Sequence, residues 1–255
     1  MWTAALWGLV QGLTEFLPIS SSGHLVLIPA LLEIEPPDLA TTAVLHLGTL
    51  VAVLWYFRTD LAWLARFRTD AAAARMVRLL ALATLPAIVA GLLLRSTLED
   101  LNDRPRSVAV ALLVTGVVLG ASEVFRRKLL ERSAEDVDGS DAAIIGLAQA
   151  TALVPGISRS GMTIVAGVGR SLRPEQAARF AFLLGIPIIA ISGAAQAVEL
   201  AGEGGLTGSV WLGVVVAAVA GYAAIAVLLR LLRRTGLAVF SAYCLAFGAW
   251  SLLVL

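Results

Sequence analysis

Residues 11–24 have the sequence QGLTEFLPISSSGH, which interrupts an apolar N-terminal segment with polar side chains and a proline. Residues 142–168 repeat this design around the break Pro155-Gly-Ile-Ser-Arg-Ser-Gly161. Each apolar arm is too short to cross a bilayer, which takes about 20 helical residues. Irregular backbone at membrane depth is tolerated only where protein buries it or where it lines a wet cavity. We therefore predict two re-entrant helical hairpins, at residues 1–32 and 142–168.

The remaining hydrophobic residues gather into six longer blocks. The 255-residue chain is 59% hydrophobic and only 15% charged, whereas soluble domains carry about 25% charged residues. The blocks are long enough to cross a membrane, at residues 39–57, 76–94, 107–125, 180–198, 210–229 and 237–255. The sequence thus predicts an all-α polytopic membrane protein, a single membrane domain spanning 1–255, with six full crossings plus two re-entrant hairpins. The net charge of +1 and the absence of a basic face exclude a nucleic-acid partner.

The two hairpins also reveal an internal repeat. An offset of 138 residues places Gln11 on Gln149 and residues 19–23 on residues 157–161. Each repeat half, about 1–128 and 140–255, then holds one hairpin and three crossings. Because three is odd, the second half must lie upside down relative to the first. Inverted-topology repeats with broken helices place their shared site near the bilayer midplane.

Loop charges predict the orientation of this topology. One face carries 15 of the 19 Lys and Arg residues, in loops 58–78, 126–132, 170–179 and 230–234. The opposite face has only Arg95, Arg104 and Arg106. The positive-inside rule makes the basic loops cytoplasmic. Both termini and the first hairpin then enter from outside, and the second hairpin enters from the cytoplasm.

Four ionisable residues lie within the predicted membrane segments: Glu15, His24, His46 and Arg159. Charged groups at this depth are costly, so each is a functional candidate. Gln11 and Glu15 are four positions apart, which places both side chains on one helix face, where they could converge on one ligand. A lone histidine on an apolar helix is more often a hydrogen-bonded core residue, so for His46 a structural role is favoured.

The serines at 20–22 follow Pro18 and precede His24. They offer three hydroxyls and free backbone N–H groups at a helix start, a site that attracts anions. The alternative is structural: the serines cap a helix, and His24 pairs with Glu15.

In the second hairpin, an arginine replaces the central serine of the first. Arg159 stands between Ser158 and Ser160, and its planar guanidinium suits phosphate. The alternative is an ion pair with Glu15 that only holds the hairpins together. A carboxylate facing an arginine also fits a divalent cation that bridges carboxylate and phosphate, as Mg²⁺ commonly does.

Residues 11–24 and 155–161 resemble the two signature motifs of the undecaprenyl-diphosphate phosphatase family linked to bacitracin resistance, and the resemblance covers essentially the whole chain. It implies hydrolysis of a polyprenyl diphosphate to the monophosphate and inorganic phosphate, which recycles the lipid carrier for cell-envelope glycan synthesis. It further implies a plasma-membrane enzyme whose active site opens to the outer face and needs a divalent cation. Mg²⁺ is the first choice, and Ca²⁺ and Mn²⁺ remain open.

The resemblance also implies residue roles. Glu15 would be the acidic metal ligand or base, Gln11 the partner position on the metal, Ser21 the nucleophile or phosphate contact, His24 the proton-transfer partner and Arg159 the phosphate clamp. Further phosphate contacts would come from Ser20, Ser22, Ser158, Ser160 and Thr163. Many family members have glutamate where this chain has Gln11, which puts in doubt any mechanism with two carboxylates on the metal.

Inverted repeats with broken helices also suit alternating access, so a lipid-phosphate transporter or flippase is the main alternative. A transporter would move its substrate without releasing phosphate. The combined hydroxyl, imidazole, carboxylate and guanidinium groups favour hydrolysis. The sequence leaves open whether serine or water attacks, and whether the chain forms a homodimer in the membrane.

Overall fold

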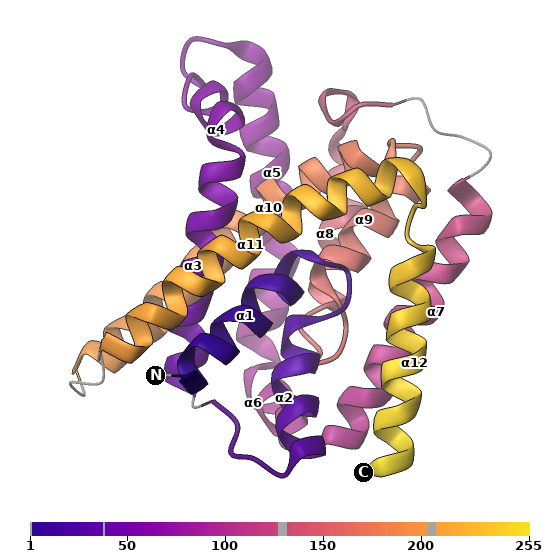
Figure 1. Ribbon diagram of the computed structural model, residues 1–255. Helices are drawn as coiled ribbons and strands as arrows, with labels where there is room; N and C mark the ends of the chain where they lie inside the picture. Colours follow the sequence, from indigo (N-terminus) through magenta and orange to yellow (C-terminus); the bar gives the residue numbers. More distant parts are fainter. Residues whose placement is uncertain (1, 38, 127–131, 203–207) are drawn as a thin grey trace.

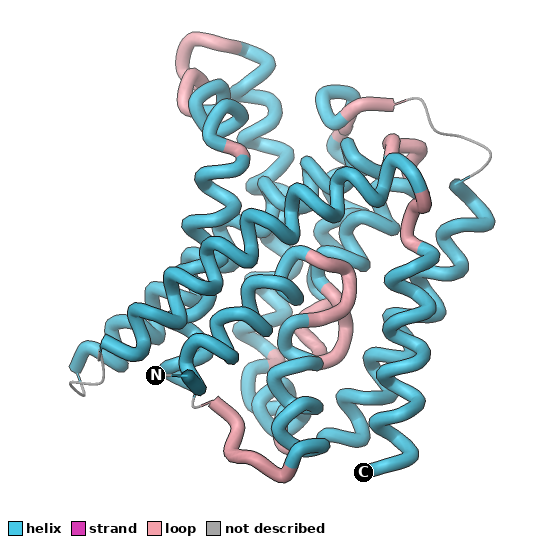
Figure 2. Tube along the Cα trace, in the orientation of Figure 1, coloured by secondary structure: helices cyan, strands magenta, loops and turns pink. Residues whose placement is uncertain are grey.

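The computed structural model describes residues 2–37, 39–126, 132–202 and 208–255, and this part of the chain is helical with no named strand (Figures 1 and 2). The first half contains α1 (Trp2–Phe16), α2 (Ser21–Leu32), α3 (Leu39–Tyr56), α4 (Arg58–Leu64), α5 (Ala71–Leu93), α6 (Arg95–Asn102) and α7 (Pro105–Arg126). The second half contains a 3₁₀ turn (Ala134–Asp136), α8 (Gly139–Thr151), α9 (Arg159–Gly169), α10 (Pro174–Gly202), α11 (Gly208–Arg234) and α12 (Ala238–Val254).

Long apolar helices confirm the predicted class of multi-pass α-helical membrane protein. Four stretches are long and apolar enough to cross a bilayer: Ala71–Leu93, Pro105–Val124, Pro174–Ile191 and Val210–Arg234. They lie in α5, α7, α10 and α11. The other two expected crossings correspond to α3, with 18 residues, and α12, with 17. The count of six crossings stays a prediction.

Both predicted hairpins are pairs of short helices separated by a break. Pro18 lies in the break between α1 and α2, where Ser20 adopts a positive φ of 66°. Pro155 lies between α8 and α9, beside Gly156 at φ 94°. Figure 2 shows these two breaks as loops in the interior of the bundle, away from its ends. Proline and left-handed backbone end a helix at such points.

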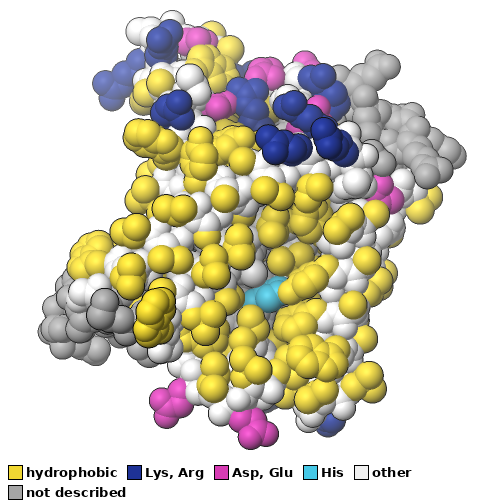
Figure 3. Space-filling model, in the orientation of Figure 1, with side chains coloured by type: hydrophobic (Ala, Val, Ile, Leu, Met, Phe, Trp, Pro, Cys, Tyr) yellow, Lys and Arg dark blue, Asp and Glu magenta, His cyan; other side chains and the backbone are white. Residues whose placement is uncertain are grey.

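Basic side chains gather at one end of the molecule, around α4, the 3₁₀ turn and the end of α11 (Figure 3). On the face shown in Figure 3, hydrophobic side chains cover the middle of the molecule. At the basic end Arg179 of α10 pairs with Asp60 of α4 and with Glu135, both at 2.5 Å. This spatial separation of charge agrees with the loop asymmetry in the sequence, and the ion pairs join segments from both halves.

Candidate active site

The scaffold of the site is a pair of capped helix starts. The Ser20 hydroxyl accepts a hydrogen bond from the Gly23 backbone N–H at 3.2 Å and caps α2. The Ser158 hydroxyl accepts from the Gly161 N–H at 3.1 Å and caps α9. Such caps satisfy N–H groups that a helix start leaves unpaired. The capping alternative is therefore confirmed for Ser20, and Ser158 has the same structural role.

Hydroxyl groups also join the two breaks to each other. Ser20 donates to the carbonyl of Ile157 at 3.4 Å, and Ser160 donates to the carbonyl of Leu17 at 3.1 Å. Ser22 lies within hydrogen-bonding distance of Ser20, at 3.3 Å between the hydroxyl oxygens. The breaks lie against each other and share one polar region, although they are more than 130 residues apart in the sequence.

Thr115 of α7 supports the second break from outside the hairpin. Its hydroxyl accepts from the Ser158 N–H at 3.1 Å and donates to the Gly156 carbonyl at 3.0 Å. Sequence reasoning missed this residue, whose only signal is a hydroxyl inside an apolar helix. The Thr163 hydroxyl donates to the Arg159 carbonyl at 2.8 Å, and its predicted contact with phosphate stays a prediction.

The Glu15 carboxylate is the point where the two hairpins meet. Its Oε1 accepts from Nη2 of Arg159 at 2.6 Å, across the hairpin interface. Its Oε2 accepts from the Ser21 hydroxyl at 2.7 Å and from Nε2 of Gln11 at 3.0 Å. Glu15 is buried, and a buried carboxylate needs such partners to stay charged. The Arg159–Glu15 ion pair of the structural alternative is thus present, and a hydroxyl contacts the same carboxylate.

His46 of α3 lines the same pocket as this carboxylate. Its Nδ1 donates to the Thr42 carbonyl at 2.8 Å, because a carbonyl can only accept. That contact directs Nε2 towards Glu15, at 3.7 Å from Oε2. His46 therefore has the structural hydrogen bond that the sequence favoured, and it also faces the site.

His24 points away from Glu15. Its Nδ1 donates to the Ser20 carbonyl at 2.8 Å, and its Nε2 lies 2.7 Å from the Tyr243 hydroxyl of α12. The imidazole packs against both Tyr243 and Phe247, with ring centroids 5.6 and 5.0 Å away. The structure therefore does not bring His24 to the reacting groups, and its proton-transfer role stays a prediction without support from proximity.

The polar groups open into a pocket of about 250 Å³. Of the ten predicted site residues, the pocket lining includes Glu15, Ser20, Ser21, Ser22, Ser158 and Arg159. The predicted residues outside the lining are Gln11, His24, Ser160 and Thr163. Thr14, His46 and Gln149 add polar groups, and apolar residues of α5, of the break between α8 and α9, and of α10 complete the walls. The pocket is small and polar at one side, which suits a compact anion.

The donor set around Glu15 fits a divalent cation only in part. Among the described residues, no three His, Cys, Asp or Glu side chains come together. Glu15 is the carboxylate of the pocket, and the buried Oε1 of Gln11 has no hydrogen-bond partner within the described chain. One carboxylate and one amide oxygen match the way Mg²⁺ binds when substrate phosphates complete its coordination. The residues thus fit a cation that arrives with, or is shared by, a phosphate ligand.

Gly185 of α10 makes room for the arginine. A Cβ added at this position would overlap the Arg159 guanidinium. Sequence reasoning assigned this glycine no role. The lack of a side chain at 185 allows Arg159 to reach Glu15.

Comparison with known proteins gives a consistent result across nearly the whole chain. A family model described as bacitracin resistance protein BacA matches residues 4–250. An undecaprenyl-diphosphatase of Nostoc sp. is 40% identical over 96% of this chain and 81% of its own length. An undecaprenyl-diphosphatase 2 of Stutzerimonas stutzeri is 42% identical, covering 94% and 93%. One from Gemmatimonas aurantiaca is 41% identical, covering 97% and 95%.

Proposed function

The chain belongs to the bacitracin resistance protein BacA family, and we propose that it hydrolyses undecaprenyl diphosphate to the monophosphate and inorganic phosphate. The observation that carries the proposal is the contact of one buried carboxylate, Glu15, with Ser21 of the first hairpin and Arg159 of the second. In this arrangement the Ser21 hydroxyl is the nucleophile, the Glu15 carboxylate is the proton acceptor, and the Arg159 guanidinium binds phosphate. All three groups line one pocket. None of the relatives reported above is named as a transporter, so the flippase alternative gains no support from them.

In this proposal the protein has six crossings and two re-entrant hairpins that enter from opposite faces, as an inverted repeat of residues 1–128 and 140–255. The four long apolar helices and the interior position of both breaks support it. The basic end of the molecule faces the cytoplasm. The pocket opens to the outer face of the plasma membrane, where the substrate's diphosphate enters and its prenyl chain remains in lipid.

The pocket would bind the diphosphate through fixed positive charge and helix N-termini. Arg159 uses one nitrogen for Glu15, and its planar guanidinium has further N–H donors for a phosphoryl group. The starts of α2 and α9 meet at the pocket, where Ser20 and Ser158 form part of the lining. Helix N-termini stabilise anions through free N–H groups and the helix dipole.

The reaction would begin with attack by the Ser21 hydroxyl on the terminal phosphorus. The proton passes from Oγ to Oε2 of Glu15, across the existing hydrogen bond of 2.7 Å. The Oγ–P bond forms, the bridging P–O bond breaks, and prenyl monophosphate leaves. Water then attacks the phosphoserine and the Oγ–P bond breaks; protonated Glu15 returns its proton to Oγ, and the water oxygen with its protons leaves as part of inorganic phosphate. Arg159 stabilises the charge on the phosphoryl oxygens in both steps.

The residues that would hold a divalent cation are Glu15 and Gln11. A bound cation would neutralise part of the diphosphate charge, and Mg²⁺ fits the hard oxygen donors best, with Ca²⁺ and Mn²⁺ also compatible. Because position 11 is an amide in this chain, Glu15 supplies the charge of this pair. The cation would be released more readily than from a site with two carboxylates.

The two histidines receive different roles. His46 is the imidazole beside the reacting groups, and we assign to it the interaction that orients Glu15. His24 is a positioning residue, because it holds the Ser20 carbonyl and packs the first break against α12.

The test is phosphate release from undecaprenyl diphosphate by the purified protein in detergent, with and without EDTA. We expect metal-dependent release, and loss of release in an Arg159→Ala variant that keeps its monodisperse elution profile. Substrate movement across vesicles without phosphate release would instead support the transporter. Full activity in Ser21→Ala would exclude the serine as nucleophile and leave direct attack by water.

A further inference from the structure

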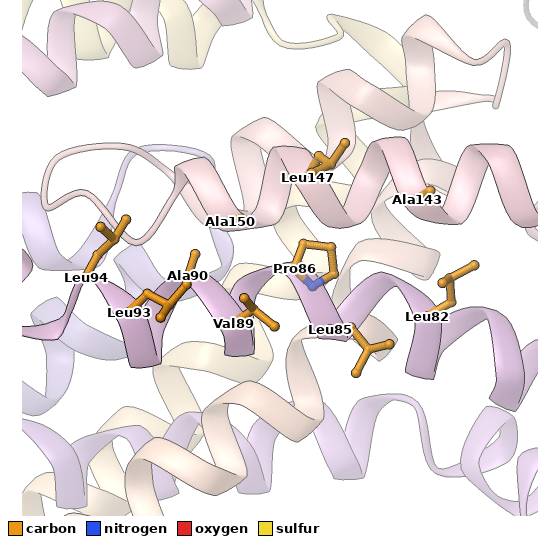
Figure 4. Close-up of a pocket in the computed structure, with 10 residues that line it drawn as sticks. All are labelled: Leu82, Leu85, Pro86, Val89, Ala90, Leu93, Leu94, Ala143, Leu147 and Ala150. Atoms are coloured by element: carbon orange, nitrogen blue, oxygen red, sulfur yellow. The ribbon is translucent and has the colours of Figure 1, made fainter.

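A second, larger pocket lies between α5 and α8 (Figure 4). Its volume is about 620 Å³, and its lining is hydrophobic throughout. One wall is formed by residues from Leu82 to Leu94, and the other by Ala143, Leu147 and Ala150 of α8. Figure 4 shows the two helices side by side, with side chains from both at the groove. With a rise of about 1.5 Å per residue, the α5 wall is roughly 18 Å long.

The groove is next to the catalytic pocket along the same two helices. Ala87 of α5 and Gln149 of α8 line the catalytic pocket, and their neighbours Pro86 and Ala150 line the groove. Leu153, which also lines the catalytic pocket, extends to α5, where its Cδ1 lies 3.8 Å from the Cβ position at Gly91. The two pockets are thus lined by adjacent residues of the same two helices, so an apolar chain attached to a group in the catalytic pocket starts close to the groove.

The corresponding helices of the other half, α1 and α11, are in close contact at two successive glycine positions. At the sequence offset of 138, Gly8 corresponds to Gly146 and Gly12 to Ala150. Cβ atoms added at Gly8 and Gly12 would both overlap the backbone of α11, so α1 and α11 are in direct backbone contact. Gly146 makes the same close approach to α5. One turn later, however, α8 has Ala150 where α1 has Gly12. In addition, α5 contains Pro86, which lines the groove. An interior proline removes a helical hydrogen bond and bends the helix.

We propose that the groove between α5 and α8 binds the first isoprene units of the substrate's prenyl chain. This inference rests on the proposed function, because the chain is covalently attached to the diphosphate that the neighbouring pocket would hold. Attachment gives the first units a high effective concentration at the groove. The hydrophobic lining buries them with no polar group to satisfy. The asymmetry between the two helix pairs then directs the chain to one side of the molecule.

Kinetics with a matched pair of variants test the proposal. Ala90→Phe fills the groove, whereas Ala81→Phe makes the same change nine residues earlier, on the opposite, exposed face of α5. The substrates are undecaprenyl diphosphate and a diphosphate with one isoprene unit. We expect Ala90→Phe to lower kcat/KM for the long substrate about tenfold and to leave the short one nearly unchanged. Ala81→Phe should behave as wild type with both.

Equal kinetics for the two variants on the long substrate would overturn the proposal. Failure of the wild-type protein to release phosphate from any substrate would instead contradict the proposed function.

A photoreactive group on the second isoprene unit of the substrate provides a test that needs no variant. If peptides of α5 and α8 are labelled, and excess unlabelled substrate prevents this labelling, the result would support binding of the prenyl chain in the groove. Labelling of α1 and α11 instead, or labelling that only excess phospholipid removes, would assign the groove to bilayer lipid and overturn the inference.

Discussion

The breaks of the two hairpins have the same scaffold and different chemistry. Each has a proline, a capping serine and a serine two positions later. At the position between these serines, the first hairpin has Ser21 and the second has Arg159. The same offset of 138 that matches them places Leu153 where the first hairpin has Glu15. The repeat therefore builds the scaffold twice and the reactive group set once.

Electrostatics explains why the two halves differ. A symmetric site would bring two carboxylates or two guanidinium groups together within the membrane, where like charges repel strongly. Placing Glu15 on one hairpin and Arg159 on the other gives each charge a partner at 2.6 Å. The Ser21 hydroxyl then occupies the position that a second arginine would take.

Removing the guanidinium geometry of the second hairpin should have the largest effect. Arg159→Lys keeps the charge but loses the planar donor set, so kcat/KM for phosphate release should fall about 10³-fold. Arg170→Lys is the control, because Arg170 contacts Asp141 at the base of this hairpin and does not line the pocket. If Arg159→Lys retained more than a tenth of wild-type activity, the phosphate clamp would lie elsewhere.

Removing the hydroxyl of the first hairpin should have the next largest effect. Ser21→Ala should lower kcat about 10²-fold or more, because the nucleophile is lost while phosphate binding remains. Ser22→Ala removes a neighbouring hydroxyl that also lines the pocket, and should cost about tenfold at most. Rapid-quench kinetics on both variants provide the measurement. Equal losses would mean that neither serine forms the covalent bond.

Crowding the arginine should weaken activity less. Gly185→Ala places a Cβ against the Arg159 guanidinium and should lower kcat/KM about tenfold, since misplacing a catalytic group is costly. Gly169→Ala makes the same change at a site with no atom near the new Cβ. The contrast would disappear if the arginine moved freely in the pocket, and both variants would then match wild type.

The smallest effect should appear at the base of the second hairpin. There Asp141 accepts from Arg132 and from Arg170, both at 2.6 Å, whereas residues 2–10 of the first hairpin carry no charge. Burial alone would raise the pKa of Asp141, but the hydrogen bonds from Arg132 and Arg170 hold this pKa below its usual value. The stabilisation is therefore present at neutral pH and is lost as the pH falls through the lowered pKa.

Asp141→Asn should lower the free energy of unfolding by about 1–2 kcal/mol at neutral pH, with little change in activity. The loss should shrink on acidification, because the wild-type carboxylate is then protonated as well. Thermal unfolding in detergent at several pH values measures both, with the exposed Asp100→Asn as control. If the stability difference between wild type and Asp141→Asn grew towards acid pH, the lowered pKa assigned to Asp141 would be contradicted.

Much of the site could be predicted from the sequence. Polar residues and prolines within apolar segments have few structural uses, so Glu15, Ser21 and Arg159 were identifiable as a group. The two histidines show the limit. Both are ionisable residues in apolar helices, and which one faces Glu15 depends on partners distant in the sequence: Tyr243 and Phe247 hold His24 away. Nothing in the local pattern around residue 24 specifies a contact with α12.

The sequence by itself determined the membrane class, the two helix breaks, the repeat and the residue types that meet at the site. These follow from hydropathy and backbone chemistry, which act locally. Only the tertiary structure decided which side chains touch: the position of His46, the room that Gly185 leaves for Arg159, and the groove beside Pro86. These depend on how helices pack at distances of a few ångströms, because packing in a dense interior is decided by the shapes of both partners.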